Sequence, residues 1–231
     1  MRPLTRLRPK PLLPLGRSTL VDHAIERVRS VTQRVAVNAH HGADQIDAHL
    51  SGRVHLSIEP HEALGTAGAI GHLAGWLGDD DLIVVNGDTW CPGDLAGVVD
   101  GWDRDVVRVV VAGQAELTPT SRIVASLYPA RVARSLAPEP SGLYEVCWRP
   151  RQEQGRIDVV GWDGPMIDCG TPKAYLAANL MVSGGRPVIG DGALVEGSVI
   201  RTVVWPGARV WPHEVLVDAI RTDSQMTVLI R

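Results

Sequence analysis

The chain has 231 residues, of which 45% are hydrophobic and 21% charged, and its net charge is −3. This length and balance are those of a soluble globular protein with one sizeable α/β domain and a small appendage, rather than of two full domains. A basic surplus and an apolar run of about 20 residues are absent, so we expect a cytoplasmic protein without nucleic-acid or membrane partners.

The first sixteen residues contain four prolines. Proline is excluded from helix interiors and central strands, so we expect an extended segment that holds Lys10 in a fixed direction. Its interleaved leucines favour docking on the body of the protein, and a disordered proline-rich arm is the alternative. Lys10 and Lys173 are the only lysines among 23 basic residues, and lysine suits a phosphate as a mobile point charge.

Residues 19–58 alternate between helical and strand patterns. Apolar positions recur at helical spacing over residues 19–31, and residues 43–50 form a second expected helix. Residues 34–38 and 54–58 have the pattern of short strands. This alternation predicts βαβ units and a largely parallel sheet.

Residues 64–77 form the next expected helix, which opens with Leu64-Gly65-Thr66-Ala67-Gly68. Small residues at a helix start allow a ligand to approach the backbone, whose N–H groups and dipole favour an anion or the edge of a base. Tight helix packing also requires small residues, so both explanations of this motif stay open.

An apolar run over residues 82–85 is followed by Asn86-Gly87-Asp88. The run predicts a strand that is buried on both faces and opens into a loop at Gly87. Asp88 then lies at the rim of the sheet, where open α/β sheets bind ligands, and a carboxylate there suits Mg²⁺ carried by phosphates. Asn-Gly-Asp is also a common turn sequence, which is the plainer explanation.

The middle of the chain is harder to assign. We expect a helix over residues 95–102 and strands over residues 106–112 and 157–160. Prolines break residues 114–151 into short pieces, of which Ser141-Gly142-Leu143-Tyr144-Glu145 is expected to face a pocket.

A second acid-bearing turn, Asp168-Cys169-Gly170-Thr171-Pro172, precedes an expected helix over residues 172–180. Thr171 is a natural N-cap, and Pro172 suits the first helical position. Asp168 therefore lies on a loop just before a helix. We expect Asp88 and Asp168 to converge on one cation.

The last part of the chain, residues 183–231, changes character. Aliphatic residues recur every six positions from Ile189, and Val204, Val210 and Leu216 resume this period after a slip of three residues. Such a period, with glycines between, predicts a short parallel β-helix, and an irregular β-tail is the alternative. Only about two coils fit, so the tail must pack on the main domain or on another subunit, which makes a homo-oligomer possible.

Together these motifs resemble the sugar-1-phosphate nucleotidyltransferase (NDP-sugar pyrophosphorylase) family, and most of all its mannose-1-phosphate guanylyltransferase-like branch. The resemblance covers most of the chain. It implies a Rossmann-like, mostly parallel α/β sheet flanked by helices (GT-A type) in residues 1–182, and a short left-handed β-helix-like tail in residues 183–231. It also implies transfer of a nucleotidyl group from a nucleoside triphosphate to a sugar 1-phosphate, with release of pyrophosphate and a requirement for Mg²⁺.

The resemblance further implies roles for single residues. The stretch from Arg2 to Pro11 resembles the family's phosphate-binding signature, with Lys10 as the catalytic lysine. Asp88 matches the first magnesium-binding acid and is counted as catalytic, and Asp168 matches the second. The residues expected to bind substrate or nucleotide are Arg2, Leu64, Gly65, Thr66, Gly68, Asn86 and Gly87, to which the polar loop before residue 146 adds Glu145.

Two departures from the family pattern matter. The family begins with a strand and a Gly-x-Gly-Thr-Arg loop just before the position of Met1, so we expect a gap in the sheet, a missing wall at the nucleotide and a start site further upstream. The family's Glu-Lys-Pro segment is not recognisable between Arg122 and Arg151, which leaves the sugar open. Two other functions stay open: a non-catalytic regulatory homologue that binds sugar nucleotides, and an N-acetylmuramate-1-phosphate uridylyltransferase-like enzyme.

Overall fold

The computed structural model describes residues 1–230, and the chain separates into two units. Unit 1 comprises residues 1–24, 87–90 and 167–231, and unit 2 comprises residues 25–86 and 91–166. The sequence patterns predict a domain boundary after residue 182, and the two units divide the chain differently. The boundary after residue 182 therefore stays a prediction. Within residues 1–230, no helix has the length and apolar character needed to cross a membrane.

Unit 1 begins with two 3-10 turns, η1 (Leu4–Arg6) and η2 (Lys10–Leu12). The expectation of an extended segment is therefore wrong, because the fixed φ of proline, about −65°, also fits a helical turn. Docking through the leucines is confirmed, since Leu4, Leu13 and Leu15 are fully buried.

Short ladders and one helix complete the first part of unit 1. Strand β1 (Pro14–Leu15) pairs with β2 (Ser18–Thr19), and β6 (Thr89–Trp90) pairs with β10 (Ile167–Asp168), both in antiparallel fashion. Helix α8 (Pro172–Val182) follows β10. Its expected N-cap is confirmed, because Thr171 Oγ1 accepts a hydrogen bond from Ala174 N at 3.1 Å.

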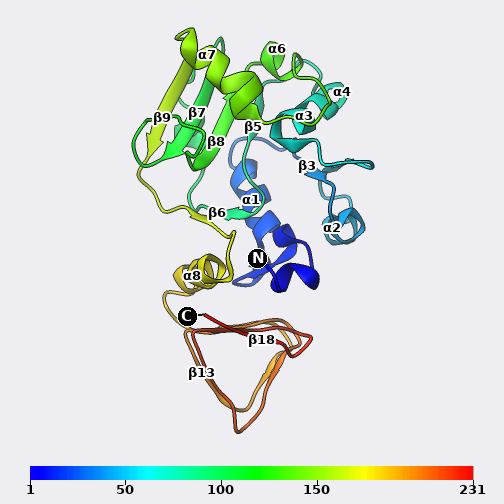
Figure 1. Ribbon diagram of the computed structural model, residues 1–231, viewed down its shortest axis with the longest axis vertical. Coiled ribbons are helices and arrows are strands. Elements are labelled where there is room, and N and C mark those ends of the chain that lie inside the picture. Colours follow the sequence, from blue (N-terminus) through cyan, green and yellow to red (C-terminus); the bar gives the residue numbers. More distant parts are fainter. Residues whose placement is uncertain (231) are drawn as a thin grey trace. The chain divides into compact units, whose positions relative to one another are not determined.

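The C-terminal part of unit 1 consists of short strands, which trace a triangular outline in Figure 1. The strands are β11 (Val188–Ile189), β12 (Leu194–Val195), β13 (Ser198–Ile200), β14 (Val203–Val204), β15 (Arg209–Val210), β16 (Val215–Val217), β17 (Ala219–Arg221) and β18 (Thr227–Leu229). Each of β11 to β14 pairs in parallel with the strand three positions later, and β18 closes antiparallel on β17. Val204, Val210 and Leu216, which carry the six-residue period, are buried.

Unit 2 alternates helices and strands over much of its length, as expected. The second half of α1 (Leu20–Arg29) belongs to it, and its other elements are β3 (Ala36–Ala39), α2 (Ala43–Leu50), β4 (His55–Ile58), α3 (Gly65–His72), α4 (Ala74–Leu77), β5 (Leu82–Val84), α5 (Ala96–Val99), β7 (Val107–Ala112), β8 (Ile123–Tyr128), α6 (Ala130–Ala133), the π-helix η3 (Tyr144–Trp148), α7 (Arg149–Glu153) and β9 (Ile157–Trp162). The helix expected over residues 64–77 is split at Leu73 into α3 and α4, and the helix expected over residues 95–102 is shortened to α5.

The strands of unit 2 form two sheets. β3 and β4 pair in parallel, and a four-stranded sheet has the order β5-β8-β7-β9. In the larger sheet β8 runs antiparallel to both β5 and β7, and only β7 and β9 are parallel. The expectation of a mostly parallel sheet is wrong there, because β8 comes from the stretch of residues 114–151 that the sequence patterns could not assign.

The strand before Asp88 also differs from its prediction. β5 pairs only with β8 among the described residues, and its three residues are half-buried rather than buried on both faces. β4 likewise pairs only with β3 among residues 1–230. The two sheets are thus not joined by strand pairing, which is consistent with the expected gap.

Candidate active site

The three residues expected to carry the chemistry, Lys10, Asp88 and Asp168, lie together in unit 1. Lys10 Nζ donates hydrogen bonds to Asp88 Oδ2 at 2.7 Å and to Asp168 Oδ1 at 3.0 Å. Lys10 is 78 positions from Asp88 and 158 from Asp168 in sequence. Folding therefore places one cation between two carboxylates that the sequence keeps far apart.

Backbone pairing holds the two carboxylates near each other. Asp168 ends β10 and pairs with Thr89 of β6, so Asp88 directly precedes a paired residue. Three residues after Asp168, Thr171 caps α8. The short ladder and the capped helix thus fix the chain on both sides of the acids.

The two carboxylates change the electrostatics of their neighbours. Burial lowers the pKa of Lys10, but the hydrogen bond and charge of Asp88, followed by those of Asp168, outweigh it and hold this pKa above its ordinary value. Lys10 is therefore a cation throughout the physiological range. Burial raises the pKa of the Cys169 thiol to about 11, so this thiol is neutral beside the acids.

The donor set of Asp88 and Asp168 fits a magnesium ion. Their side chains are 39% and 60% exposed, so carboxylate oxygens are open to solvent and to substrate. Within residues 1–230 no cluster of three or more His, Cys, Asp or Glu side chains is suited to a metal. Two carboxylates, with the other positions left to water and phosphate oxygens, are the usual protein contribution to bound Mg²⁺.

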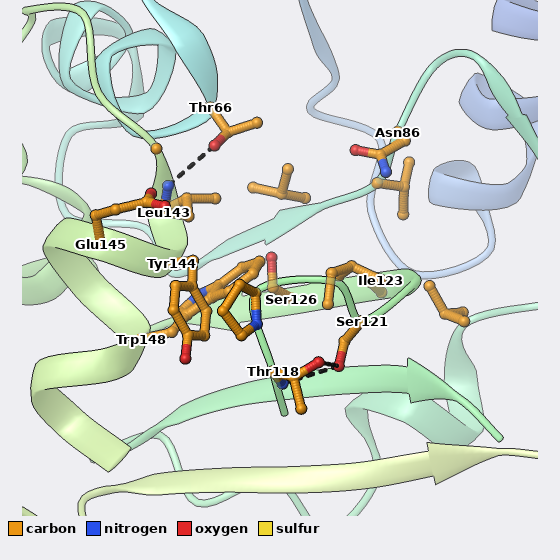
Figure 2. Close-up of a pocket in the computed structure, with 16 residues that line it drawn as sticks. Thr66, Asn86, Thr118, Ser121, Ile123, Ser126, Leu143, Tyr144, Glu145 and Trp148 are labelled. Carbon is orange, nitrogen blue, oxygen red and sulfur yellow. Dashed lines mark hydrogen bonds between the residues drawn. The ribbon is translucent and has the colours of Figure 1, made fainter. Parts of the chain in front are cut away.

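Unit 2 contains a pocket of about 300 Å³, shown in Figure 2. This volume is at the lower end of the range for small-molecule sites, about 300–1,000 Å³. The loop expected to face a pocket does so, because Gly142 to Glu145 line it. The lining residues are Thr66, Val84, Val85, Asn86, Thr118, Pro119, Ser121, Ile123, Val124, Ala125, Ser126, Gly142, Leu143, Tyr144, Glu145 and Trp148.

Two residues that line this pocket, Ser126 and Trp148, are joined behind it by a third buried side chain, that of Tyr128. Trp148 Nε1 donates to Tyr128 Oη at 3.0 Å, and Tyr128 Oη donates to Ser126 Oγ at 2.9 Å. Burial raises the pKa of Tyr128, which keeps its hydroxyl a donor. Because Ser126 Oγ accepts from Tyr128, its own proton can be donated to a ligand, and Figure 2 shows this hydroxyl pointing into the pocket.

The start of α3 is tied to the loop that lines the pocket. Thr66 Oγ1 accepts a hydrogen bond from Leu143 N at 3.0 Å, drawn in Figure 2. Ala67 N donates to Ser141 O at 3.1 Å, and Ser141 N donates to Leu64 O at 3.0 Å. These bonds make the two segments one rigid rim.

The glycines of α3 allow this close approach. A Cβ at Gly65 would lie 2.6 Å from Ser141 O, and a Cβ at Gly68 would lie 2.2 Å from Glu139 O. Tight packing, the alternative left open by the sequence, therefore accounts for both residues. Their contact with a ligand stays a prediction.

Sequence reasoning missed Glu59, which organises the same rim. Its side chain is 3% exposed and accepts hydrogen bonds from Asn38 Nδ2 and Leu64 N, both at 2.9 Å. A buried carboxylate that is hydrogen-bonded in this way is stabilised by its partners. Its only sequence signal is an acid directly after a strand, which is too common to be decisive.

The predicted site residues fall in both units. Unit 1 contains Lys10, Asp88 and Asp168, together with exposed Arg2 and half-buried Gly87. Unit 2 contains the predicted residues Leu64, Gly65, Thr66, Gly68, Asn86 and Glu145. Of these, Thr66, Asn86 and Glu145 line the pocket.

Comparison with known proteins identifies the fold family. Residues 4–155, more than half of the chain, match the family described as "MobA-like NTP transferase domain". An N-acetylmuramate alpha-1-phosphate uridylyltransferase of Caulobacter vibrioides is 29% identical over 217 residues, which cover 77% of this chain and 90% of that protein.

Two further relatives are informative. A mannose-1-phosphate guanylyltransferase of Mycobacterium tuberculosis is 29% identical over 106 residues, but these cover 43% of this chain and 30% of that protein. The crystal structure of HddC from Yersinia pseudotuberculosis in complex with GMP-PN superposes with a TM-score of 0.62 at 18% identity, over 76% of this chain and 90% of that chain. This likeness shows a shared mixed α/β nucleotidyltransferase fold.

Proposed function

The chain belongs to the family of MobA-like NTP transferase domains, and from that premise we propose that it transfers a nucleotidyl group from a nucleoside triphosphate to a sugar 1-phosphate. The named relatives are sugar-1-phosphate nucleotidyltransferases. The observation that carries the proposal is Lys10 held between Asp88 and Asp168. A cation and two carboxylates are the groups that phosphoryl chemistry requires for positioning and charge neutralisation.

In this reaction a phosphate oxygen of the sugar 1-phosphate attacks the α-phosphorus of the triphosphate. A new P–O bond forms as the bond to pyrophosphate breaks, with the attacking and leaving oxygens in line. Lys10 binds the phosphate oxygens and offsets their charge, and no side-chain nucleophile is required. Asp88 and Asp168 would hold Mg²⁺, which supplies further neutralisation of the phosphates when bound.

The pocket of unit 2 suits the uncharged part of a substrate. Tyr144 and Trp148 offer apolar ring surface, and Thr66 and Ser126 offer hydroxyl groups. The Glu145 carboxylate can accept hydrogen bonds from sugar hydroxyls or from a base amide. We assign this pocket to recognition of the sugar or the base.

The identity of the base and the sugar rests on two observations that favour different pairs. The uridylyltransferase of Caulobacter vibrioides aligns over 77% of this chain and 90% of its own length, which favours UTP and N-acetylmuramate 1-phosphate. None of the residues that line the pocket is Lys, Arg or His, so the pocket offers no cation to the carboxylate of a muramyl sugar. A neutral sugar such as mannose 1-phosphate is favoured on that ground, and GTP would accompany it by analogy with the mannose-1-phosphate guanylyltransferase of Mycobacterium tuberculosis.

The deciding experiment is pyrophosphate release with Mg²⁺ over a panel of nucleoside triphosphates and sugar 1-phosphates. We expect one base and one sugar to exceed all other pairs. A second panel measures the melting temperature with each sugar nucleotide. Stabilisation by a sugar nucleotide without turnover of any pair would support the non-catalytic, regulatory function instead.

We further propose that residues 183–231 form a short left-handed β-helix-like tail. The parallel pairing of β11 to β14 with later strands supports a coil. Ile200, Val215 and Val217 are exposed on it, which favours a homo-oligomer formed through the tail. Light scattering of the wild type and of the Val215→Lys variant tests this, because the substitution should dissociate such an oligomer.

A further inference from the structure

The segment that carries Lys10 is held on both sides by one tryptophan of the tail. Before Lys10, the guanidinium of Arg8 lies over the Trp205 ring, 4.6 Å from its centroid. After Lys10, Pro14 O accepts a hydrogen bond from Tyr175 Oη. Tyr175 Oη in turn accepts one from Trp205 Nε1 at 3.1 Å. Trp205 is thus linked to the chain two residues before Lys10 and four residues after it.

The hydrogen bonds between Trp205, Tyr175 and Pro14 are buried, and further contacts hold Pro14 and Arg8 in place. Trp205 and Tyr175 are both fully buried, so a lost hydrogen bond would leave a buried polar group without a partner. Burial also raises the pKa of Tyr175, which keeps its hydroxyl a donor to Pro14. Asn179, one helical turn along α8, donates to Pro14 O at 3.3 Å. Arg8 is fixed further by an ion pair with Asp223.

Lys10 depends on such anchors more than the two acids do. Lys10 opens the 3-10 turn η2, which is only three residues long, and so short a turn is weak support by itself. Asp88 and Asp168 are instead held by the β6–β10 ladder and by the cap of α8. Changes at Trp205 should therefore displace the lysine and leave the acids in place.

We propose that Trp205 is a positioning residue for nucleotidyl transfer, which holds the Lys10 backbone in register with Asp88 and Asp168 through Arg8 on one side and Tyr175 on the other. This inference rests on the proposed function of Lys10 as the phosphate-binding group. It makes the β-tail part of the catalytic unit rather than an independent module.

The Trp205→Phe variant tests the proposal. It retains an aromatic ring for packing and removes the N–H donor to Tyr175. We expect kcat to fall about tenfold while KM for both substrates stays within about twofold, because a small displacement of a catalytic group affects the transition state most. In a Lys10→Met background the same change should have no further effect on kcat. Additive losses in the double variant would overturn the proposal.

Two control variants separate positioning from stability. Thr202 is also fully buried in the tail, where its single hydroxyl proton is shared between Ile200 O and Leu216 O, at 2.8 and 3.0 Å from Oγ1. Trp211 is likewise stacked with an arginine, Arg209, at 3.6 Å. Thr202→Val should lower the melting temperature, Trp211→Phe makes the same ring change at another tryptophan that is stacked with an arginine, and both variants should keep wild-type kcat. A tenfold loss of kcat in either control would refute a specific role for Trp205.

A second variant covers the case in which Trp205→Phe does not fold. The Arg8 side chain is 26% exposed, so Arg8→Met removes the stacked guanidinium without emptying the core. We expect kcat to fall about threefold, with the same lack of additivity in the Lys10→Met background. Unchanged kcat in folded Arg8→Met, or a loss that adds in full to that of Lys10→Met in the double variant, would overturn the proposal.

A readout independent of turnover separates this inference from the proposed function. Because the chain has only two lysines, Lys10 and Lys173, protein labelled with ¹³Cε-lysine gives two side-chain signals. Trp205→Phe should move the Lys10 signal toward that of exposed Lys173, and Thr202→Val should leave both in place. An unmoved Lys10 signal refutes the positioning role. A wild type that turns over no substrate pair refutes the proposed function while this spectrum still tests the link.

Discussion

The Lys10 cluster of unit 1 and the pocket of unit 2 differ in the kind of chemistry they offer. The cluster consists of one cation and two carboxylates at hydrogen-bond distances of 2.7 and 3.0 Å. The pocket is lined by hydroxyls, aromatic rings and apolar side chains, with Glu145 as its only charged group. We therefore expect charge neutralisation and the recognition of neutral groups to depend on different parts of the chain.

The two regions also differ in how they are assembled. The cluster joins residues from positions 10, 88 and 168, of which the two acids are held by the β6–β10 ladder and Lys10 lies in the turn η2. The pocket is built from neighbouring pieces of unit 2, chiefly β8, the start of α3 and the η3 segment. Substitutions in the cluster should therefore affect the rate of the chemical step, and substitutions in the pocket should affect substrate affinity.

The largest expected effect is that of Asp88→Asn. The change keeps the shape of the side chain and removes a charge that pairs with Lys10 and would bind Mg²⁺. We expect kcat for pyrophosphate release to fall about a thousandfold, with the fold intact by circular dichroism. Asp191→Asn, at an exposed acid of the same unit, should be neutral. If Asp88→Asn retained more than a tenth of the wild-type kcat, Asp88 would not be a catalytic residue.

The second effect is that of Lys10→Met, which keeps the aliphatic stem and removes the ammonium. We expect kcat to fall about a hundredfold. Binding of Mn²⁺, followed by its paramagnetic signal, should persist, because both carboxylates remain. Lys173→Met, at the exposed second lysine, is the matched control and should keep full activity. Loss of metal binding in Lys10→Met would mean that the ammonium organises the acids rather than the phosphates.

The third effect tests the pocket. Glu145 is exposed at its rim, so Glu145→Gln should fold normally and lose only the charge of one hydrogen-bond acceptor. We expect KM for the sugar 1-phosphate or the triphosphate to rise about tenfold with kcat nearly unchanged. Glu153→Gln, on α7 of the same unit, should change neither constant. A fall in kcat with unchanged KM in Glu145→Gln would show that the pocket, like the cluster, acts on the chemical step rather than on substrate affinity.

The cluster was easier to predict from sequence than the pocket. Lys10, Asp88 and Asp168 each lie in a short motif of turn residues, prolines and a cap, and such motifs are local. Thr171 and Pro172, for example, marked the start of α8 correctly. Local signals therefore sufficed to place the start of α8 after Asp168, whereas the paired strands β6 and β10 beside the acids were not predicted.

The pocket depends on non-local pairing, which left no comparable signal. β8 lies between β5 and β7, but its residues belong to a proline-broken stretch without clear periodicity. Ser126, Tyr128 and Trp148 form their hydrogen-bonded chain only once that strand is in place. The direction of the sheet was mispredicted for the same reason, since a single inserted antiparallel strand changes two of its three pairings.

The smallest expected effect concerns stability and pH, and it belongs to the cluster alone. The pKa of Lys10 is raised above its ordinary value of 10.5. A group with a raised folded-state pKa stabilises the fold fully below its unfolded pKa, and this contribution is lost as pH rises through the folded pKa.

The difference in unfolding free energy between wild type and Lys10→Met should thus be constant from pH 7 to pH 10 and shrink above about pH 10.5. Because the paired carboxylates are partly exposed, we expect a difference of less than about 1 kcal/mol. Urea unfolding at pH 8 and pH 11 measures it, with Lys173→Met as the control that stays flat. A difference that grows at pH 11 would show that the ammonium is strained between the acids rather than stabilised by them.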